Sequence, residues 1–172
     1  MKIKHLLTSM VAIALCSSCG VNQTYVKRLM ELKQCQGCNL ERVDLSHQIL
    51  SGANLKGSNL SGGNLQRSTL FSADLNGARL VKTDLQGADL GAANLSKADL
   101  RNADLRGADL SSADLSYADL RGSNLEYANL SNANLGNARL SGAKLEGANL
   151  AHAELDGAIG LVVDDATGDR QP

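Results

Sequence analysis

Residues 103–112 read ADLRGADLSS and contain the five-residue unit A-(D/N)-L-x-x twice in succession. The same unit extends in both directions, so that leucine occupies every fifth position from Leu40 to Leu155, 24 times without a break. The residue two places before each leucine is usually small, and it is alanine in 16 of the 24 repeats. A helix repeats on one face every three or four residues and a strand every two, so a period of five fits neither. The chain must therefore turn a corner once in every repeat.

This motif closely resembles that of the pentapeptide-repeat family, across roughly two-thirds of the chain. The resemblance implies an all-β fold, a right-handed quadrilateral parallel β-helix of about six coils with one pentapeptide on each side. The leucine and the small residue of each repeat would point inward and the other three residues outward. Stacked coils can then pair their N–H and C=O groups at a spacing of about 4.8 Å. We expect this solenoid over residues 38–160, with the end of the last coil and a mobile tail over 161–172.

Two residues break the small-residue position near the start of the repeats. Val43 and Gln48 stand where alanine is usual. Larger side chains at this position compete with the leucines for a closely packed interior. We therefore expect the first coil to be the least regular.

The first 18 residues have the features of a bacterial export signal. Lys2 and Lys4 precede an apolar segment over residues 6–15, which is too short to span a bilayer as a helix. The small residues before Cys19 resemble the lipobox of lipoproteins, which implies cleavage before Cys19, its acylation, and a location in the periplasm or outer membrane. Cys16 stands where a lipobox favours leucine. Secretion without a lipid and an uncleaved N-terminal anchor are therefore the alternatives.

Residues 19–37 are expected to form a linker and an amphipathic helix. Val21, Tyr25, Leu29 and Leu32 recur at helical spacing, with charged residues on the other faces. A stacked solenoid leaves an apolar end and unpaired strand edges, which terminal caps cover. We expect this helix to cap the first coil. A helix that binds a partner or lies on a membrane surface is the alternative.

Cys35 and Cys38 form a C-x-x-C pair directly before the first leucine repeat. By the register of the repeats, Cys38 takes the small inward position and Cys35 that of the preceding leucine. Such a pair can be a disulfide, a redox dithiol or half of a metal site. No neighbouring histidine accompanies it, so a four-ligand zinc site is not expected. An exported protein favours a structural disulfide, with buried free thiols and a thiol-based redox function as alternatives.

The sequence contains no recognisable catalytic motif. His5 lies in the export signal, and His47 and His152 are expected at outward positions about five coils apart, so they cannot share a site. Most aspartates directly precede a leucine, where a carboxylate commonly bonds the nearby backbone. The glycines follow the repeat and do not gather in a phosphate-binding loop. We predict that the protein is not an enzyme and has no cofactor and no metal site.

With four repeats per coil, residues 20 positions apart would stack in rows along the rod. One row is smooth and nearly uncharged, and Phe71 is its only large side chain. We expect this row to be an interaction face for a flat protein partner or for a second rod in a homodimer. Its members include Ser51, Phe71, Gly91, Ser111, Ser131 and His152. Another row is basic, with Arg101 and Arg121 partly offset by Asp99 and Asp119.

These features favour a non-enzymatic, exported pentapeptide-repeat protein that acts as a rigid interaction or scaffold module at the bacterial cell envelope. Its expected partners are an unidentified protein and, through an acylated Cys19, the membrane. The resemblance also supplies an alternative, because quinolone-resistance members of the family resemble duplex DNA and bind a topoisomerase. The formal net charge is −1, or −3 without Lys2 and Lys4, which is weak mimicry of a polyanion. We expect no nucleic-acid binding.

Overall fold

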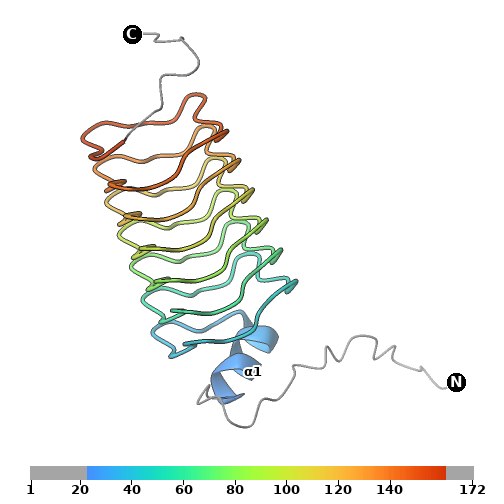
Figure 1. Cartoon of the computed structure of the whole chain (residues 1–172). Coiled ribbons are helices and arrows are strands. Elements are labelled where there is room, and N and C mark those ends of the chain that lie inside the picture. Colours follow the sequence, from blue (N-terminus) through green and yellow to red (C-terminus); the bar gives the residue numbers. More distant parts are fainter. Residues whose placement is uncertain (1–22, 162–172) are drawn as a thin grey trace, which may run out of the picture.

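The computed structural model describes residues 23–161. It consists of a short helix, α1 (Gln23–Leu32), and a stack of coils that begins beside this helix (Figure 1). The expected export signal, Cys19 and the tail from residue 162 lie outside the described residues. Helix α1 lies at one end of the stack and residue 161 at the other (Figure 1). None of the described helical structure is long and apolar enough to cross a membrane.

Each coil uses 20 residues, because the residue before each inward leucine, or before Cys35 at the start, pairs in parallel with a residue 20 positions away. The first such pair is Gln34 with Asn54 and the last is Arg139 with Ile159. Backbone hydrogen bonds of 2.6–3.0 Å accompany these pairs, for example from Leu105 N to the Asn124 carbonyl at 2.7 Å. The described chain is therefore one continuous stack with a constant register.

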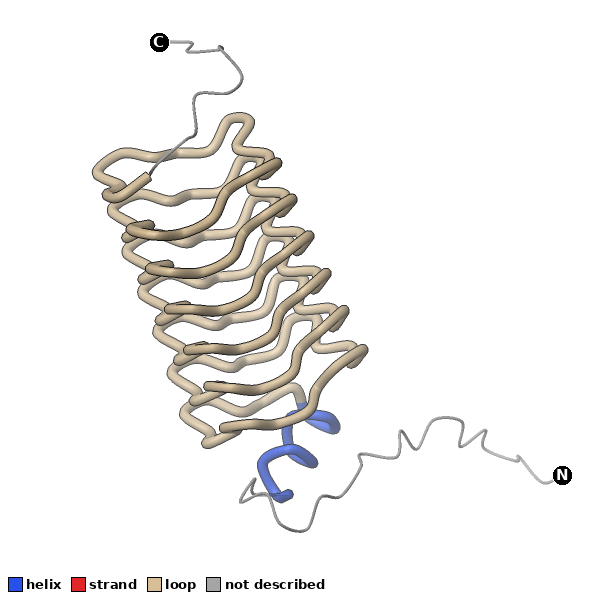
Figure 2. The backbone as a smooth tube through the Cα atoms, viewed as in Figure 1, coloured by secondary structure: helices blue, strands red, loops and turns tan. Residues whose placement is uncertain are grey.

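The pairing residues form isolated bridges, and residues 23–161 contain no extended strand (Figure 2). The expectation of an all-β chain is corrected in this respect. The reason lies in the length of each side. A corner such as Leu50-Ser51-Gly52-Ala53 takes up four of every five residues, so only one, here Asn54, forms β-bridges, although Leu50 N and Gly52 N also donate to the next coil.

The corners explain the two variable positions of the repeat. Ala53 N donates to the Leu50 carbonyl at 3.0 Å, and the residue between them, Gly52, has a φ of +65°. A hydrogen bond over three residues with a positive φ at the third position is typical of a type II turn. The same conformation occurs at non-glycine residues, such as Lys82 at +57° and Ala92 at +53°. The chain tolerates these strained residues because the main-chain N–H of each donates to the next coil, Lys82 to the Arg101 carbonyl at 3.0 Å and Ala92 to that of Ser111 at 2.9 Å.

The interior is a ladder of leucines, which confirms the predicted inward register. Every leucine of the repeat from Leu40 to Leu140 is at most 1% exposed, and the alanines two places earlier are buried with them. Burial of one leucine stabilises by about 1.5–3 kcal/mol. Where serine replaces alanine, its hydroxyl donates to a main-chain carbonyl, as Ser58 does to Leu55 at 2.7 Å. The polar replacements are thus satisfied inside the rod.

The first coil keeps the same bridge register as the later coils, but Gln48 is only half-buried and its main-chain hydrogen bond to the Leu45 carbonyl is 3.3 Å long, so this corner is looser than those with alanine. Asp44 pairs with Asn64 and Ile49 with Thr69, as in later coils. Val43 fits because the residue above it is Gly63, where a Cβ would lie 3.4 Å from Val43 Cγ1 and 3.1 Å from its carbonyl oxygen. The side-chain amide of Gln48 donates a hydrogen bond to the main-chain carbonyl of Ser46, at 3.2 Å.

Helix α1 packs on the N-terminal end of the leucine ladder. Val26 and Leu29 are buried in the core, and Tyr25 and Met30 are partly buried against it. Leu32, which the helical spacing placed on the same apolar face, is 64% exposed. The helix ends there, because the next residue adopts a left-handed φ of +55° and the chain turns into the first coil.

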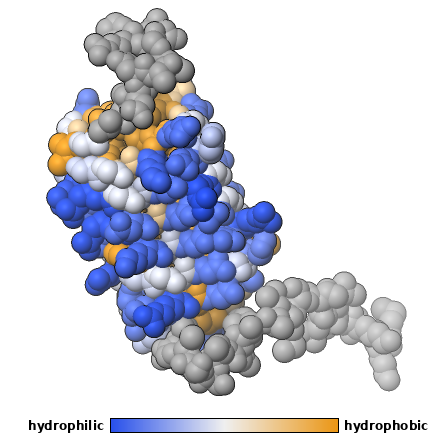
Figure 3. Space-filling view, in the orientation of Figure 1, coloured by the Kyte–Doolittle hydropathy of each residue, from blue (hydrophilic) through white to orange (hydrophobic). Residues whose placement is uncertain are grey.

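The C-terminal end of the described stack is more open. Leu145, Leu150 and Leu155 are partly exposed, whereas the equivalent leucines of earlier coils are buried. Apolar surface is visible at this end of the rod (Figure 3). The end of the last coil, expected from residue 161, is described only at Leu161, and Ile159 just before it still pairs with Arg139 in the preceding coil.

Candidate interaction surfaces

The residues predicted to form a smooth face lie at one corner of the rod. Main-chain bonds join successive coils there, from Ser72 N to the Gly91 carbonyl at 2.8 Å and from Ser112 N to the Ser131 carbonyl at 2.9 Å. We call this row the smooth corner; its residues are Ser51, Gly52, Phe71, Ser72, Gly91, Ala92, Ser111, Ser112, Ser131, Asn132, Ala151 and His152. None of these residues carries a formal charge while the histidine is neutral. The structure therefore brings the predicted face together as one strip along the rod.

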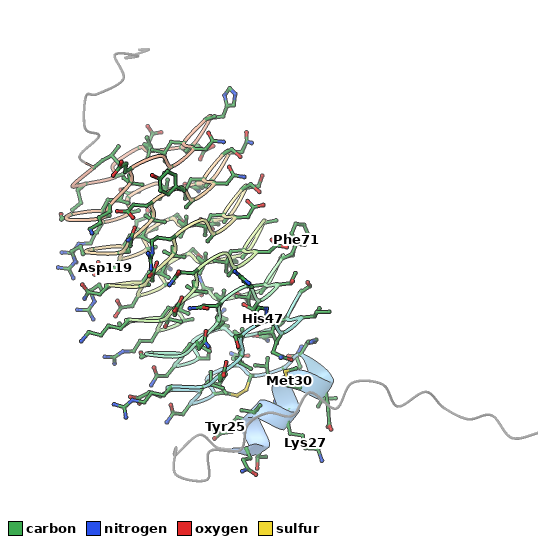
Figure 4. The ribbon with its side chains drawn as sticks, turned by 45° about the vertical axis from the view of Figure 1, so that its right-hand side comes forward. Tyr25, Lys27, Met30, His47, Phe71 and Asp119 are labelled. Carbon is green, nitrogen blue, oxygen red and sulfur yellow. A yellow bond between two sulfur atoms is a disulfide. The ribbon has the colours of Figure 1, made fainter. Side chains whose placement is uncertain are left out.

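Phe71 is the one large side chain of the smooth corner, and it is 50% exposed. Its ring leans over the next coil, where a Cβ on Gly91 would lie 3.1 Å from Phe71 Cδ2. Gly91 is accordingly buried although it stands at an outward position. The ring points out from the rod in Figure 4. An aromatic group on a flat strip of small residues is a chemical feature that a protein partner could recognise.

A ladder of ion pairs lies on another side of the rod. Arg101 bonds Asp99 at 2.8 Å, and Arg121 bonds Asp119 at 2.6 Å. Asp119 also lies 3.7 Å from Arg139 and 4.0 Å from Arg101, so it joins three guanidinium groups from three successive coils. The two aspartates therefore neutralise much of the basic row that the sequence predicted.

Hydrogen bonding sets the ionisation of these carboxyl groups. The side-chain hydrogen bond from Arg121 lowers the pKa of Asp119, against a smaller opposing effect of burial. The bonds from Arg101 and Arg106 lower the pKa of Asp99 and Asp104 in the same way. The Arg106–Asp104 pair, at 2.7 Å, lies one corner further round the coil and was not singled out from the sequence. These carboxylates are charged structural partners of arginine.

The other carboxylates and amides before the leucines bond the local backbone, as predicted. Asp109 Oδ1 accepts a hydrogen bond from Ser111 N at 2.9 Å, and Asp114 Oδ1 accepts one from Ser116 N at 2.9 Å. Asn134 does the same for Gly136 at 2.8 Å. This geometry lets Asp or Asn stabilise the start of each corner. The residue before each leucine is therefore usually Asp or Asn, because these side chains stabilise the turn that follows.

A disulfide joins Cys35 and Cys38 in the structure. Both residues are buried beneath α1, at 0% and 3% exposure, as the inward register predicted. Cys35 Sγ lies 3.4 Å from the carbonyl oxygen of Tyr25 in the helix. A disulfide sulfur has no proton to donate, so we treat this approach as a packing contact. The disulfide therefore lies where α1 meets the first coil (Figure 4).

His47 and His152 lie at different corners and in well-separated coils, and both are exposed. Among residues 23–161 there is no group of three or more histidine, cysteine, aspartate or glutamate side chains placed to hold a metal ion. The chemistry of the described surface is that of turns, ion pairs and small polar groups.

Several apolar side chains are exposed outside the smooth corner, and only Leu32 among them was singled out from the sequence, as part of the apolar face of the helix. Ile49 is 69% exposed in the first coil, and Leu32 is 64% exposed at the end of α1. Tyr117 and Tyr127 are 61% and 69% exposed at two other corners. The register places Ile49 and both tyrosines at outward positions, so their exposure could have been predicted from the repeat pattern. Leu32 could not be placed without knowing where the helix turns.

Several pentapeptide repeat proteins of known structure are similar to this chain. The chain is similar to HetL of the cyanobacterium Nostoc sp. strain PCC 7120, a pentapeptide repeat protein involved in heterocyst differentiation regulation, with 34% identity over 73% of this chain and 76% of that one (TM-score 0.39). It is similar to Rfr23 of Cyanothece 51142, with 34% identity over 80% and 97% of the two chains (TM-score 0.35). QnrB1, a plasmid-mediated fluoroquinolone resistance protein, is 23% identical over 73% and 64% (TM-score 0.47).

A search of the curated proteins found no significant match. The family model for pentapeptide repeats matches residues 38–77, 49–87, 88–126 and 123–159, in 8 copies. These matches cover the leucine ladder and its corners, and they imply the right-handed quadrilateral β-helix of that family. The chain belongs to the pentapeptide-repeat family.

Proposed function

We propose that this protein is an exported, non-enzymatic scaffold that is held at the bacterial cell envelope by a lipid on Cys19 and binds a protein partner through its smooth corner. Residues 1–18 would be removed as the signal. The mature protein would lie in the periplasm or on the periplasmic side of the outer membrane. The rod would serve as a rigid support of fixed length.

The observation that carries this proposal is the sequence around Cys19, next to a rod that begins at α1. A basic start, a short apolar segment and small residues before a cysteine are the features by which an export signal is recognised. The buried Cys35–Cys38 disulfide is consistent with an oxidising compartment. Both features favour a location outside the cytoplasm.

The smooth corner supports the binding part of the proposal. The strip itself carries no formal charge, so a flat protein partner that binds it desolvates no charged side chain of the strip, which would otherwise oppose association. Asp89 and Asp109 border the strip and already accept hydrogen bonds from Gly91 N and Ser111 N. Phe71 supplies one exposed aromatic group in the middle of small residues. Aromatic anchors surrounded by small contacts are typical of protein interfaces.

Fractionation of a bacterium that produces the full chain tests the location. We expect the wild-type protein in the membrane fraction, from which detergent but not high salt releases it. A Cys19→Ala variant should lose this behaviour and appear as a soluble or unprocessed chain. Recovery of both proteins in the cytosol would refute the envelope location.

Site-specific photo-cross-linking tests the smooth corner. A photoreactive residue at Ser111 should capture a discrete protein in the envelope. Ser116 is the matched control, because it has the same place in its repeat and the same 2.9 Å main-chain bond to an aspartate, but lies at a different corner. Equal capture from both positions, or none from Ser111, would refute the smooth corner as the interface.

A further inference from the structure

The N-terminal end of the rod has exposed apolar side chains that are not packed into the core. They are Leu32 and Ile49, at 64% and 69% exposure. The ammonium group of Lys33 donates to the main-chain carbonyl of Ile49, which joins the end of α1 to the first coil. Leu32 and Ile49 therefore lie on one rim, formed by α1 and the coil beside it.

Cationic side chains accompany this rim. Lys27 and Arg28 are exposed on the part of α1 that is not packed against the coils, and Figure 4 shows Lys27 pointing away from the rod. Glu31 lies 4.0 Å from Lys27, with both side chains mostly exposed. Arg28 forms no ion pair with a described residue. The outer face of α1 thus combines apolar and net positive surface.

We propose that this end rests on the surface of the bilayer, with Leu32 and Ile49 in the headgroup region and Lys27 and Arg28 against anionic lipid headgroups. We call these four residues the N-terminal rim. The inference rests on the proposed lipid anchor at Cys19. It adds the orientation of the rod, which would stand away from the membrane with its last coil farthest from the lipid.

The length of the tether supports this orientation. Cys19 and Gln23 are four residues apart, and a fully extended chain of that length spans at most about 14 Å. An acyl chain on Cys19 would therefore hold the start of α1 within reach of the headgroups. The C-terminal end also exposes apolar side chains, Ile159 at 55% and the partly exposed Leu150 and Leu155, but it lies at the opposite end of the rod from the expected tether (Figure 1).

The charges favour a bilayer over a second copy as the occupant of this end. Two N-terminal rims facing each other would bring Lys27 and Arg28 of both copies together, and like charges repel. Anionic headgroups attract the same side chains, and aliphatic groups beside them can enter the interface. The combination of apolar and cationic side chains on the rim therefore suits an anionic bilayer surface better than the equally charged rim of a second copy.

Tryptophan fluorescence can test the orientation, because the chain contains no tryptophan of its own. The lipidated mature protein, which begins at Cys19, would carry Ile49→Trp or, as the matched control at the far end, Ile159→Trp. Both would be bound to vesicles of phosphatidylethanolamine and phosphatidylglycerol with brominated acyl chains. We expect several-fold stronger quenching and a blue-shifted emission for Ile49→Trp only. Unchanged thermal unfolding would show that each variant is folded.

The outcomes separate this inference from the proposal on which it depends. Protein that does not float with vesicles would refute the lipid anchor, and the orientation with it. Protein that floats with equal quenching at both positions would show a rod lying flat. Floating protein with no quenching at Ile49→Trp, or a signal that follows protein concentration without lipid, would also refute the inference.

The charge contribution has its own control. On the Ile49→Trp background, Lys27→Gln with Arg28→Gln should reduce quenching, and so should omission of phosphatidylglycerol. Lys97→Gln with Lys144→Gln, which removes two charges far from the rim, should leave it unchanged. Equal effects of the two pairs would contradict a specific contact between α1 and anionic lipid.

Discussion

The ring of Phe71 covers Gly91 in the next coil, so closely that a Cβ on Gly91 would lie 3.1 Å from Phe71 Cδ2. The two residues stand at equivalent corners of neighbouring coils, and the main-chain bond from Ser72 N to the Gly91 carbonyl holds those corners together. The smooth corner is therefore flat because a glycine follows its one aromatic residue. This relationship makes the corner testable by small changes.

Gly91→Ala should destabilise the protein by about 1 kcal/mol, at the lower end for overpacking, because the half-exposed ring can move aside. Gly91 has no left-handed φ, so the backbone itself tolerates alanine. In the Phe71→Ala background the same change should have almost no effect. Urea unfolding of the four proteins in a double-mutant cycle measures this coupling, and simple additivity would contradict the contact.

Leu105→Ala should cost about 2–5 kcal/mol, and Leu105→Lys should prevent folding, because an inward charge in the middle of the ladder has no partner. Ser116→Lys is the outward control and should change stability by less than about 0.5 kcal/mol. Thermal unfolding followed by circular dichroism checks both results. An unchanged melting temperature for Leu105→Lys would refute the inward register.

Gly107→Ala should destabilise by about 1 kcal/mol through the backbone alone. Its φ is +61°, and an added Cβ would meet no atom within 4 Å. The reverse change, Ala92→Gly, removes a left-handed alanine and should stabilise by roughly 0.5 kcal/mol, because the entropy of glycine offsets part of the relief. Equal stability of Gly107→Ala and wild type would show that these corners are not strained.

Arg121→Gln should weaken the protein at neutral pH but not in acid. The hydrogen bond from Arg121 holds the pKa of Asp119 below its ordinary 3.8, so the pair stabilises fully above pH 3.8. This contribution is lost as the pH falls through the lowered pKa of the folded state. The difference in unfolding free energy between variant and wild type should therefore be small at pH 7, since the arginine is exposed, and vanish in strong acid.

Chemical denaturation over the pH range measures that difference, with Lys56→Gln as a control. Lys56 forms no ion pair with any residue of the described part, so its substitution should give no pH-dependent difference. A difference for Arg121→Gln that persists or grows in acid would contradict the assigned role of the Asp119 carboxylate.

Reduction of the Cys35–Cys38 disulfide should lower stability by about 2 kcal/mol or less, because the loop that it closes is short. Cys35→Ser with Cys38→Ser should reproduce the loss and make added reductant ineffective. Intact mass before and after alkylation determines the thiol state directly. Two alkylated cysteines in the unreduced mature protein, in addition to any at Cys19, would show that the pair is not bridged.

The repeat made much of the interior predictable from the sequence. Because leucine recurs every five residues without a gap, only one register buries all of the leucines, and Leu105 and its equivalents could be assigned inward directly. The same register assigned Ser111 and Ser131 to one row. Features that depend on the repeat alone were therefore accessible before the structure.

Features that depend on contacts between particular residues could not be predicted from the sequence. Val43 is accommodated because Gly63 lies above it, and that compensation involves two positions 20 residues apart. Leu32 is exposed because the chain turns immediately after it, which the helical spacing cannot show. The isolated bridges follow from how much of each side the corners occupy, a property of the main chain and not of the pattern.

The central claim, a scaffold anchored in the envelope by its N-terminus, is tested most directly by the intact mass of the mature protein from bacterial membranes. We predict a chain that begins at Cys19 and carries the added mass of acyl groups, which a Cys19→Ala variant lacks. A full-length chain that begins at Met1 or its neighbour, without acyl groups and in the cytosol, would contradict the claim.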